Sequence, residues 1–353
     1  MKALRLHAAH DLRLHDEPIP VPKQDETLVR ITAAGICGSD LHWFSRGSIG
    51  TASLSQPLVP GHEFCGVVES GKDKGKRVII EPSDGCGVCD QCLAGDPNLC
   101  QNGRFAGYST TDGAFREYAA WPNHLLFTMP DNLTDVEGAM LEPLCNGLQA
   151  IDLGHVKAGK TVAVFGCGPI GLMTMQAAKA AGATQVFATE KLPHRIEAAR
   201  RMGATEVFVA DGAEDKAILN ATGGRGVDVT FETAGSNEAL RAAINTTIPG
   251  GRVVIVGIPL DERTEFNAST ARGKGLSILL QRRSHAEYRR AVRLVESGLV
   301  DVRSVVSHEF PLSDAVNAFI FNPAQVAVAR KGLKGLWSSS PIFANDMAAV
   351  SWQ

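Results

Sequence analysis

The sequence predicts an α/β protein that combines a doubly wound parallel sheet with an irregular, β-rich domain. Two observations lead to this expectation. Between residues 161 and 284, β-type runs alternate with helical runs, as they do in repeated βα units. Residues 1–80 instead hold short apolar runs broken by proline and glycine, a pattern typical of irregular β structure.

The composition is that of an ordinary globular protein. The chain has 353 residues, 44% hydrophobic and 21% charged, which is enough for two domains with cores of their own. A net charge of -3 gives no general attraction to nucleic acid or to an anionic membrane. The N-terminus lacks the apolar stretch of a secretory signal, and no run approaches the roughly 18 apolar residues of a spanning helix. We therefore expect a cytoplasmic protein without nucleic-acid or membrane partners.

The β-rich part contains three residues with metal-binding chemistry. Strands are expected at residues 28–31, 66–69 and 77–80. Near them, Cys37, His62 and Glu63 offer a thiol, an imidazole and a carboxylate, the three ligand types that zinc accepts. A catalytic zinc takes three protein ligands and keeps one position open. Taken alone the three residues prove little, because a lone cysteine is most often a small buried residue.

A polar, glycine-rich segment at residues 84–103 carries four of the eight cysteines: Cys86, Cys89, Cys92 and Cys100. The spacing C-x2-C-x2-C-x7-C allows four thiolates to close a tetrahedron around one zinc ion, and such a closed site is structural rather than catalytic. Two disulfides are the alternative, which a cytosolic chain disfavours. The other cysteines, Cys65, Cys145 and Cys167, have the character of packing residues, with Cys145 a minor ligand candidate because it is near Glu142.

Glu142 stands out because it lies in an apolar run. Thr134 and Glu137 form a capping-box pattern that predicts a helix start just before it. Burying a carboxylate there is unfavourable unless it is paired or bound to a metal. The alternative is a residue on the outer face of a short helix.

A G-x-G-x-x-G motif lies between a buried-type strand, 161–165, and a helical run that reaches Ala181. Its glycines permit a tight turn, the approach of a pyrophosphate and close helix packing, and the helix N-terminus faces the phosphates. The predicted contacts are Gly166, Gly168, Pro169, Ile170 and Gly171. A second strand, 185–189, ends at Glu190, where an acid can accept hydrogen bonds from ribose hydroxyls. Glu190 repels a 2′-phosphate, although Lys191 and Arg195 soften its charge, so we expect NAD rather than NADP.

Further elements continue the alternation. Expected elements are a helix at 193–202, strands at 206–209, 227–232, 252–257 and 276–280, helices at 285–297 and 313–321, and an extended segment at 305–312. Gly235 follows the strand at 227–232 and Gly257 ends the strand at 252–257, so both lie at the edge where a doubly wound sheet binds its ligand. Residues 322–353 have no structural prediction.

Together these motifs resemble the zinc-containing medium-chain dehydrogenase/reductases, and most of all their polyol (sorbitol, xylitol) dehydrogenase branch. The resemblance extends over residues 1–321 and rests on GICGSDLH at 35–42, GHEFCG at 61–66, the cysteine segment, LEPL at 141–144, GCGPIG at 166–171 and FETAG at 231–235. It implies a GroES-like catalytic domain in residues 1–149 and 285–353, with a Rossmann NAD-binding domain in residues 150–284. Alcohol dehydrogenases proper carry a cysteine ligand in place of Glu142.

The resemblance also implies roles for the metal-site residues. Cys37, His62 and Glu63 would hold a catalytic zinc, with Glu142 beside the zinc and its water. A hydride would pass between a secondary hydroxyl of a polyol and NAD, giving the ketose. The chain would bind two zinc ions, one catalytic and one structural. Relatives are commonly tetramers or dimers, so a homo-oligomer is expected.

Three more residues receive roles in the same way. Ser39 would take the alcohol proton and pass it through the nicotinamide ribose, and His42 would deliver it to solvent. The alternatives are a turn residue for Ser39 and a structural imidazole for His42. Arg283 would meet substrate hydroxyls, while its neighbour Arg282 would lie on a solvated face. Trp43 replaces the tyrosine of the sorbitol enzymes, which predicts an altered substrate pocket.

Two other functions remain open. One is a dehydrogenase of another secondary alcohol, such as a diol, an amino alcohol like threonine or a sugar acid like idonate. The other is a nucleotide-binding regulator without catalysis. The intact Cys37, Ser39, His62 and Glu63 argue against the regulator, because a decayed site should have lost some of them.

Overall fold

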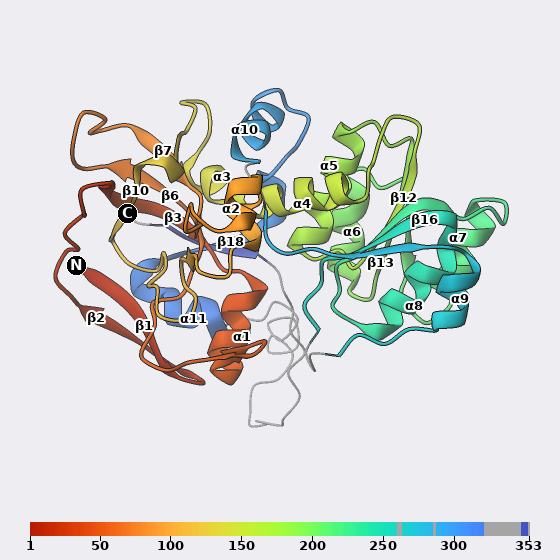
Figure 1. Cartoon of the computed structure of the whole chain (residues 1–353), viewed down its shortest axis with the longest axis horizontal. Helices are drawn as coiled ribbons and strands as arrows, with labels where there is room; N and C mark the ends of the chain where they lie inside the picture. The colour runs from red at the N-terminus through yellow and green to blue at the C-terminus, as the bar shows by residue number, and fades with distance from the viewer. Residues whose placement is uncertain (260–262, 285–286, 321–346, 352–353) are drawn as a thin grey trace. The chain divides into compact units, whose positions relative to one another are not determined.

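The computed structural model describes residues 1–259, 263–284, 287–320 and 347–351 (Figure 1). Contacts divide the chain into two compact units. The first comprises Met1–Asp84, Arg104–Met140 and Val306–Gln353, and the second comprises Gly85–Gly103 and Leu141–Val305. The domain boundaries at residues 149 and 284 stay a prediction.

A seven-stranded sheet forms the frame of the first unit, in the order β11-β7-β6-β3-β19-β18 with β10 also paired to β3. The strands are β3 (Glu26–Gly35), β6 (Glu63–Val68), β7 (Arg77–Ile80), β10 (Tyr118–Pro122), β11 (Leu126–Thr128), β18 (Val306–Pro311) and β19 (Met347–Ser351). Two-stranded pairs accompany it: β1 (Lys2–Ala8) with β2 (Asp11–Asp16), β4 (Ser48–Ile49) with β5 (Ala52–Ser53), and β8 (Ser83–Asp84) with β9 (Arg104–Phe105). The predicted β-rich character of this part is confirmed.

Strand β19 lies in the C-terminal stretch, residues 322–353, for which the residue pattern predicts no structure. It pairs antiparallel with β3, where Ala349 lies opposite Gly35 and Ser351 opposite Ala33. It also pairs in parallel with β18. The last described strand therefore supports β3, which leads directly into Cys37.

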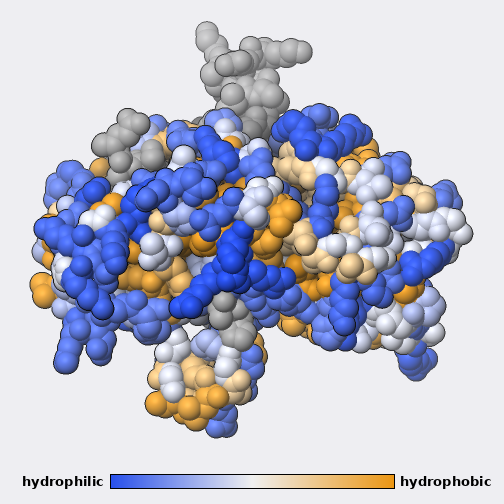
Figure 2. All heavy atoms as spheres, turned by 90° about the horizontal axis from the view of Figure 1, so that it is seen from above, coloured by the Kyte–Doolittle hydropathy of each residue, from blue (hydrophilic) through white to orange (hydrophobic). Residues whose placement is uncertain are grey.

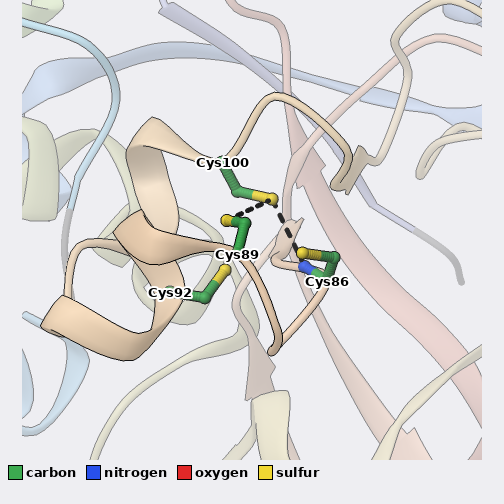
Figure 3. Close-up of side chains that lie close together, drawn as sticks. All are labelled: Cys86, Cys89, Cys92 and Cys100. Carbon is green, nitrogen blue, oxygen red and sulfur yellow. Dashed lines mark hydrogen bonds between the residues drawn. The ribbon is translucent and has the colours of Figure 1, made fainter.

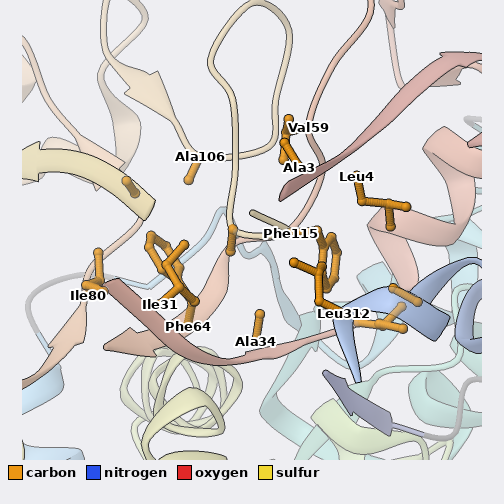
Figure 4. Packing of buried hydrophobic residues seen from close by; sticks show 14 of the residues in the cluster. Ala3, Leu4, Ile31, Ala34, Val59, Phe64, Ile80, Ala106, Phe115 and Leu312 are labelled. Carbon is orange, nitrogen blue, oxygen red and sulfur yellow. The ribbon is translucent and has the colours of Figure 1, made fainter. Parts of the chain in front are cut away.

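An apolar cluster fills the first unit, and Figure 4 shows part of it. Leu4, Ile31, Phe64 and Phe115 are all at most 1% exposed. Burying a side chain of this size contributes roughly 1.5–3 kcal/mol, so the cluster can hold the sheet and the segments that cross it.

Trp43 also belongs to this cluster and is 1% exposed. Its ring meets Tyr108 edge-on, with ring centroids 5.8 Å apart. The bulky indole therefore packs into the core, and any influence of Trp43 on the substrate would pass through its neighbours, Tyr108 among them.

The second unit contains a six-stranded parallel sheet in the order β14-β13-β12-β15-β16-β17. The strands are β12 (Thr161–Phe165), β13 (Gln185–Glu190), β14 (Glu206–Val209), β15 (Val227–Glu232), β16 (Thr247–Ile255) and β17 (Ser277–Leu280). The strand order reverses between β14 and β15, on either side of β12, as in a doubly wound sheet. The predicted fold class is confirmed, and the predicted strands match within a few residues except β16, which begins earlier.

The helices of the second unit connect or flank this sheet, except the first of them, which lies in the cysteine segment. They are α2 (Asp90–Ala94), α4 (Leu141–Leu153), α5 (Pro169–Ala180), α6 (Pro193–Arg201), α7 (Glu214–Ala221), α8 (Asn237–Thr246), α9 (Ala268–Gly273) and α10 (Tyr288–Glu296). The first unit adds α1 (Gly38–Arg46), α3 (Asp135–Ala139) and α11 (Ala315–Ile320). The predicted capping box is present: the backbone N–H of Thr134 donates to Glu137 Oε2 at 2.8 Å.

On the face shown in Figure 2, hydrophilic and hydrophobic residues are interspersed. None of the helices in the described part of the chain is long and apolar enough to span a bilayer.

Candidate functional site

Cys37, His62 and Glu63 come together in the first unit, with one ligand atom of each within 4.8 Å of the others. Cys37 directly precedes α1, and the antiparallel pairing of β3 with β6 places Gly35 opposite Glu63. A Cβ at Gly35 would lie 2.0 Å from Glu63 Oε2, so the glycine leaves room for the carboxylate. Tetrahedral zinc ligands at about 2.0–2.3 Å from the metal lie roughly 3.3–3.8 Å apart. The donor set and its spacing fit a zinc ion.

Asp40 joins the two segments that carry these ligands. Its carboxylate is 1% exposed and accepts from the backbone N–H of Cys37 at 3.0 Å and of Gly61 at 2.9 Å. Oδ1 also lies 3.7 Å from His62 Nδ1. Burial raises the pKa of Asp40 to about 7, although the two backbone N–H groups act in the opposite direction. Asp40 is not among the predicted site residues, although it occupies N3 of the helix that Cys37 caps, a capping-box position that could have pointed to it.

Ser39 and His42 lie three residues apart on α1, on one face of the helix, and both are half-buried. Their proton-relay roles stay predictions.

Cys86, Cys89, Cys92 and Cys100 converge in the second unit, as Figure 3 shows, with their sulfur atoms within 4.8 Å of one another. The sulfur atoms of Cys89 and Cys100 are 3.7 Å apart. Zinc–sulfur bonds of about 2.3 Å give a tetrahedron edge of roughly 3.8 Å. None of the eight cysteines is in a disulfide, which contradicts the disulfide alternative, and the cluster fits a structural zinc.

The segment around these thiols has little apolar support. Val88 is 78% exposed and Leu93 is 73% exposed. Gly85 packs closely against the cluster, where a larger residue would crowd it, since a Cβ there would lie 3.0 Å from Cys92 Sγ. A bound metal can therefore supply order that apolar burial does not.

The predicted dinucleotide loop has the geometry that its glycines suggest. Gly166 has a φ of +102°, and a Cβ there would lie 2.9 Å from the backbone nitrogen of Ala234. A Cβ at Gly171 would lie 2.0 Å from the carbonyl oxygen of Gly166. Gly168 precedes α5, and Pro169 occupies its first turn, so the amides of the helix N-terminus follow the loop. Ile170 lies in this first turn.

Glu190 ends β13 beside this loop and is 8% exposed. Its Oε2 accepts from the backbone N–H of Cys167 at 2.9 Å, and its Oε1 accepts from the backbone N–H of Lys191 at 2.6 Å. Arg195 Nη1 lies 3.9 Å from Oε2. The acid and the glycine loop therefore meet as predicted, with a cation beside them.

Glu142 is 4% exposed, which excludes the outer-face alternative. It lies in the first turn of α4, and its Oε1 accepts from Asn146 Nδ2 at 2.9 Å. Gln281 Nε2 donates to the carbonyl oxygens of Asn146 at 2.9 Å and of Arg283 at 3.4 Å. A hydrogen-bonded path thus joins Glu142 to the turn at Arg283. The roles of Glu142 and Arg283 stay predictions.

The two adjacent arginines in the turn at Arg283 differ in how much of each is exposed to solvent. Arg283 has a φ of +56° and is half-buried, whereas Arg282 is exposed. The carbonyl oxygen of Arg282 accepts from Asn98 Nδ2 at 3.0 Å, which connects this turn to the cysteine segment.

A buried carboxylate lies at the end of β15, ahead of Gly235. Glu232 is 2% exposed, and burial raises its pKa to about 7 despite three backbone N–H donors. Nothing in the residue pattern distinguished it from a strand-end residue, apart from its place in FETAG.

We expect Glu232→Gln to flatten the dependence of stability on pH. The pKa of Glu232 is raised from 4.5 to about 7 in the folded protein, so the protonated carboxyl group stabilises the fold. This contribution to the free energy of unfolding is fully present below pH 4.5 and is lost as the pH rises through 7. The change amounts to roughly 3 kcal/mol at most. Urea unfolding between pH 5 and pH 8 measures it. Some slope should remain, because burial also raises the pKa of Glu81 to about 7. If the free energy of unfolding changed equally with pH in wild type and Glu232→Gln, this prediction would be contradicted.

Comparisons with known proteins identify the family of this chain. The model of the alcohol dehydrogenase GroES-like domain matches residues 23–131, and that of the zinc-binding dehydrogenase matches residues 169–297. Sorbitol dehydrogenase from Bacillus subtilis is 35% identical over 325 residues, which cover 90% of this chain and 92% of that protein.

Two solved structures with bound cofactor share the fold. One, from Sinorhizobium meliloti 1021 with NADP, has 32% identity and a TM-score of 0.85, and the match covers 99% of this chain and 98% of its own. The other, an Escherichia coli CFT073 alcohol dehydrogenase with NADH, has 25% identity and a TM-score of 0.85, and the match covers 100% of this chain and 99% of its own. The chain therefore belongs to the zinc-containing medium-chain dehydrogenase/reductases, a family of NAD(P)-linked oxidoreductases, in the branch that includes sorbitol dehydrogenase.

Proposed function

We propose that the protein oxidises a secondary hydroxyl of a polyol to the ketose, with zinc and NAD. The observation that supports this most directly is the convergence of Cys37, His62 and Glu63, a donor set that fits one zinc ion and has a single cysteine. The identity with sorbitol dehydrogenase over 90% of the chain supports the polyol class.

In this proposal the first unit binds the metal and handles the proton. When bound, zinc supplies Lewis-acid chemistry that makes a hydroxyl more acidic or a ketone more electrophilic. Cys37, His62 and Glu63 hold it, and Asp40 orients the Cys37 and Gly61 backbone around them. Ser39 accepts the hydroxyl proton, and His42, on the same face of α1, passes it to solvent.

The second unit contributes the cofactor site and two polar groups. The 166–171 loop and Glu190 bind the dinucleotide, and Gly235 and Gly257 allow it to lie close to the backbone at the carboxyl ends of adjacent strands. Glu142, buried and oriented by Asn146, acts at the metal site. Arg283 binds substrate hydroxyls. Loss of Glu142 or Arg283 should therefore affect turnover and substrate binding more than folding.

A substrate panel tests the proposal. The purified protein, loaded with zinc and NAD, should release NADH with sorbitol or xylitol and react more slowly with 2,3-butanediol, threonine and idonate. A clear preference for one of the last three would replace the polyol class. If the protein binds zinc and NAD but forms no NADH with any substrate, the result would favour a nucleotide-binding regulator without catalysis.

Cofactor preference is a separate expectation. We expect Glu190→Ala to raise the ratio of NADP to NAD utilisation at least about tenfold, since a charge repulsion of about 1.4 kcal/mol corresponds to that factor. Arg195 stays beside the site and can then meet the 2′-phosphate. Initial rates with both cofactors measure the ratio. A wild-type enzyme that prefers NADP would contradict the role given to Glu190, and Glu197→Ala, exposed on α6, is the matched control.

We also propose a homo-oligomer, a dimer or tetramer, and a cytoplasmic location. Family resemblance supports both, and Leu280, 75% exposed on the edge strand β17, offers an apolar contact. Sedimentation velocity measures the oligomeric state.

A further inference from the structure

Three turns meet at the carboxyl edge of the parallel sheet, after strands β12, β15 and β16, which are neighbours in the sheet order. The first is the glycine loop at 166–171, the second is 233–236, and the third is 256–258. Ligands of doubly wound sheets bind at this edge. The spacing of the three turns therefore shapes the cofactor site.

Thr233 fastens the second turn to the first. Its hydroxyl donates to the carbonyl oxygen of Gly166 at 2.8 Å and lies 3.0 Å from that of Phe165, which also accepts from the backbone N–H of Thr233 at 2.9 Å. The Gly166 carbonyl is close-packed on its other side, where a Cβ at Gly171 would approach it to 2.0 Å. The hydroxyl thus fixes the peptide that follows the first glycine of the motif.

Glu232 holds the second turn in shape. Its Oε1 accepts from the backbone N–H groups of Ala234 at 2.8 Å, Gly235 at 2.7 Å and Ser236 at 3.3 Å. Three N–H groups that converge on one oxygen fix the turn, and Oε1 can accept them whether or not the carboxyl group is protonated. Loss of this acceptor would remove the shared partner of the three N–H groups and release the turn.

The same residue fastens the third turn. The backbone carbonyl of Glu232 accepts from the N–H groups of Val256 at 2.8 Å and Gly257 at 2.9 Å. Gly235 and Gly257 are in direct backbone contact, since a Cβ at Gly257 would lie 2.3 Å from the nitrogen of Gly235. The Glu232 carboxylate also lines a narrow pocket together with both glycines.

We propose that Glu232 and Thr233 are positioning residues for the dinucleotide: they tie the three turns into one rigid wall against which the cofactor binds. The inference rests on the proposed NAD-binding function and assigns no contact between either side chain and the cofactor. Rigid, pre-formed sites bind more tightly because less ordering is needed on binding. Releasing the Gly166 carbonyl should therefore weaken NAD binding without removing any cofactor contact.

Thr233→Val tests the proposal, because valine keeps the shape of threonine and removes only the hydroxyl. We expect its Kd for NAD, measured by isothermal titration calorimetry, to rise about tenfold, the effect of one lost hydrogen bond. Thr233→Ser keeps the hydroxyl and should restore most of the affinity. Glu232→Gln keeps an acceptor oxygen and should bind NAD more tightly than Glu232→Leu, which keeps none.

Thr230→Val is the matched control. Thr230 lies on β15, three residues before Thr233, and is fully buried. Its hydroxyl pairs with that of Thr247 at 2.9 Å, away from the three turns. We expect this variant to lose thermal stability to a similar degree as Thr233→Val while its Kd for NAD stays within twofold of wild type. Unchanged NAD affinity in Thr233→Val, or equal weakening in Thr230→Val, would overturn the inference.

Different results would contradict the proposed function. A wild-type protein that binds NAD but oxidises no polyol contradicts the proposed substrate class, and the Kd comparison still decides the role of Thr233. A wild-type protein that binds no dinucleotide overturns both. Glu232→Leu risks misfolding, and the Thr233 variants then decide the question alone.

Discussion

Cys37→Ala should lower the turnover of the zinc-loaded enzyme by more than about 100-fold. Losing a residue that only hydrogen-bonds to a metal ligand already lowers metal affinity or activity by about 10- to 100-fold. The zinc content should fall from about two ions per chain to about one, since three protein ligands hold a catalytic zinc and two do not hold it well. Folding should survive: Cys37 is half-buried and belongs to no apolar cluster. Metal analysis and steady-state rates measure the two effects.

Cys65→Ala is the matched control for this substitution. Cys65 is also a thiol of the first unit, only two residues beyond Glu63, but it is fully buried and its Sγ donates to the carbonyl oxygen of Asp135 at 3.0 Å. Burial raises the pKa of this thiol to about 12, so it is a protonated packing group. Its replacement should reduce stability and leave two zinc ions bound. A Cys37→Ala protein that keeps both ions would contradict the catalytic site.

The sequence predicted elements wherever the signal was local. The G-x-G-x-x-G turn, the acid at Glu190 and the cysteine spacing each depend on a few neighbouring residues, and each has the expected geometry. The pairing of β19 with β3 is different, because it joins Ala349 to Gly35 across almost the whole chain. No periodicity within either segment encodes that register.

The site residues that were not predicted escaped for the same reason: their roles depend on contacts between distant segments. Asp40 is an ordinary N3 acid until the fold brings Gly61 to its carboxylate. Asn146 and Gln281 are unremarkable in sequence, yet they connect Glu142 to the turn at Arg283. Such polar networks arise between segments, so they become visible only when the segments are placed.

Cys86→Ser should destabilise the second unit by more than about 3 kcal/mol, because the metal that orders a segment without an apolar core contributes directly to folding. A serine hydroxyl is a much poorer zinc ligand than a thiolate, and three thiolates leave the tetrahedron open. Val88 and Leu93 point into solvent and give no substitute for the metal. Urea unfolding monitored by circular dichroism, with zinc counted per chain, measures the loss.

The effect should extend beyond the cysteine segment. Asn98, 6% exposed, lies between the third and fourth cysteines and donates to the carbonyl oxygen of Arg282. Loosening the segment therefore loosens the turn at Arg283, and the KM for the polyol should rise in Cys86→Ser even under conditions where the protein stays folded. Val88→Ser, an exposed substitution in the same segment, is the control and should change neither stability nor KM. A Cys86→Ser protein that melts like wild type would contradict the structural zinc, and an unchanged KM in a destabilised protein would confine the role of this metal to folding.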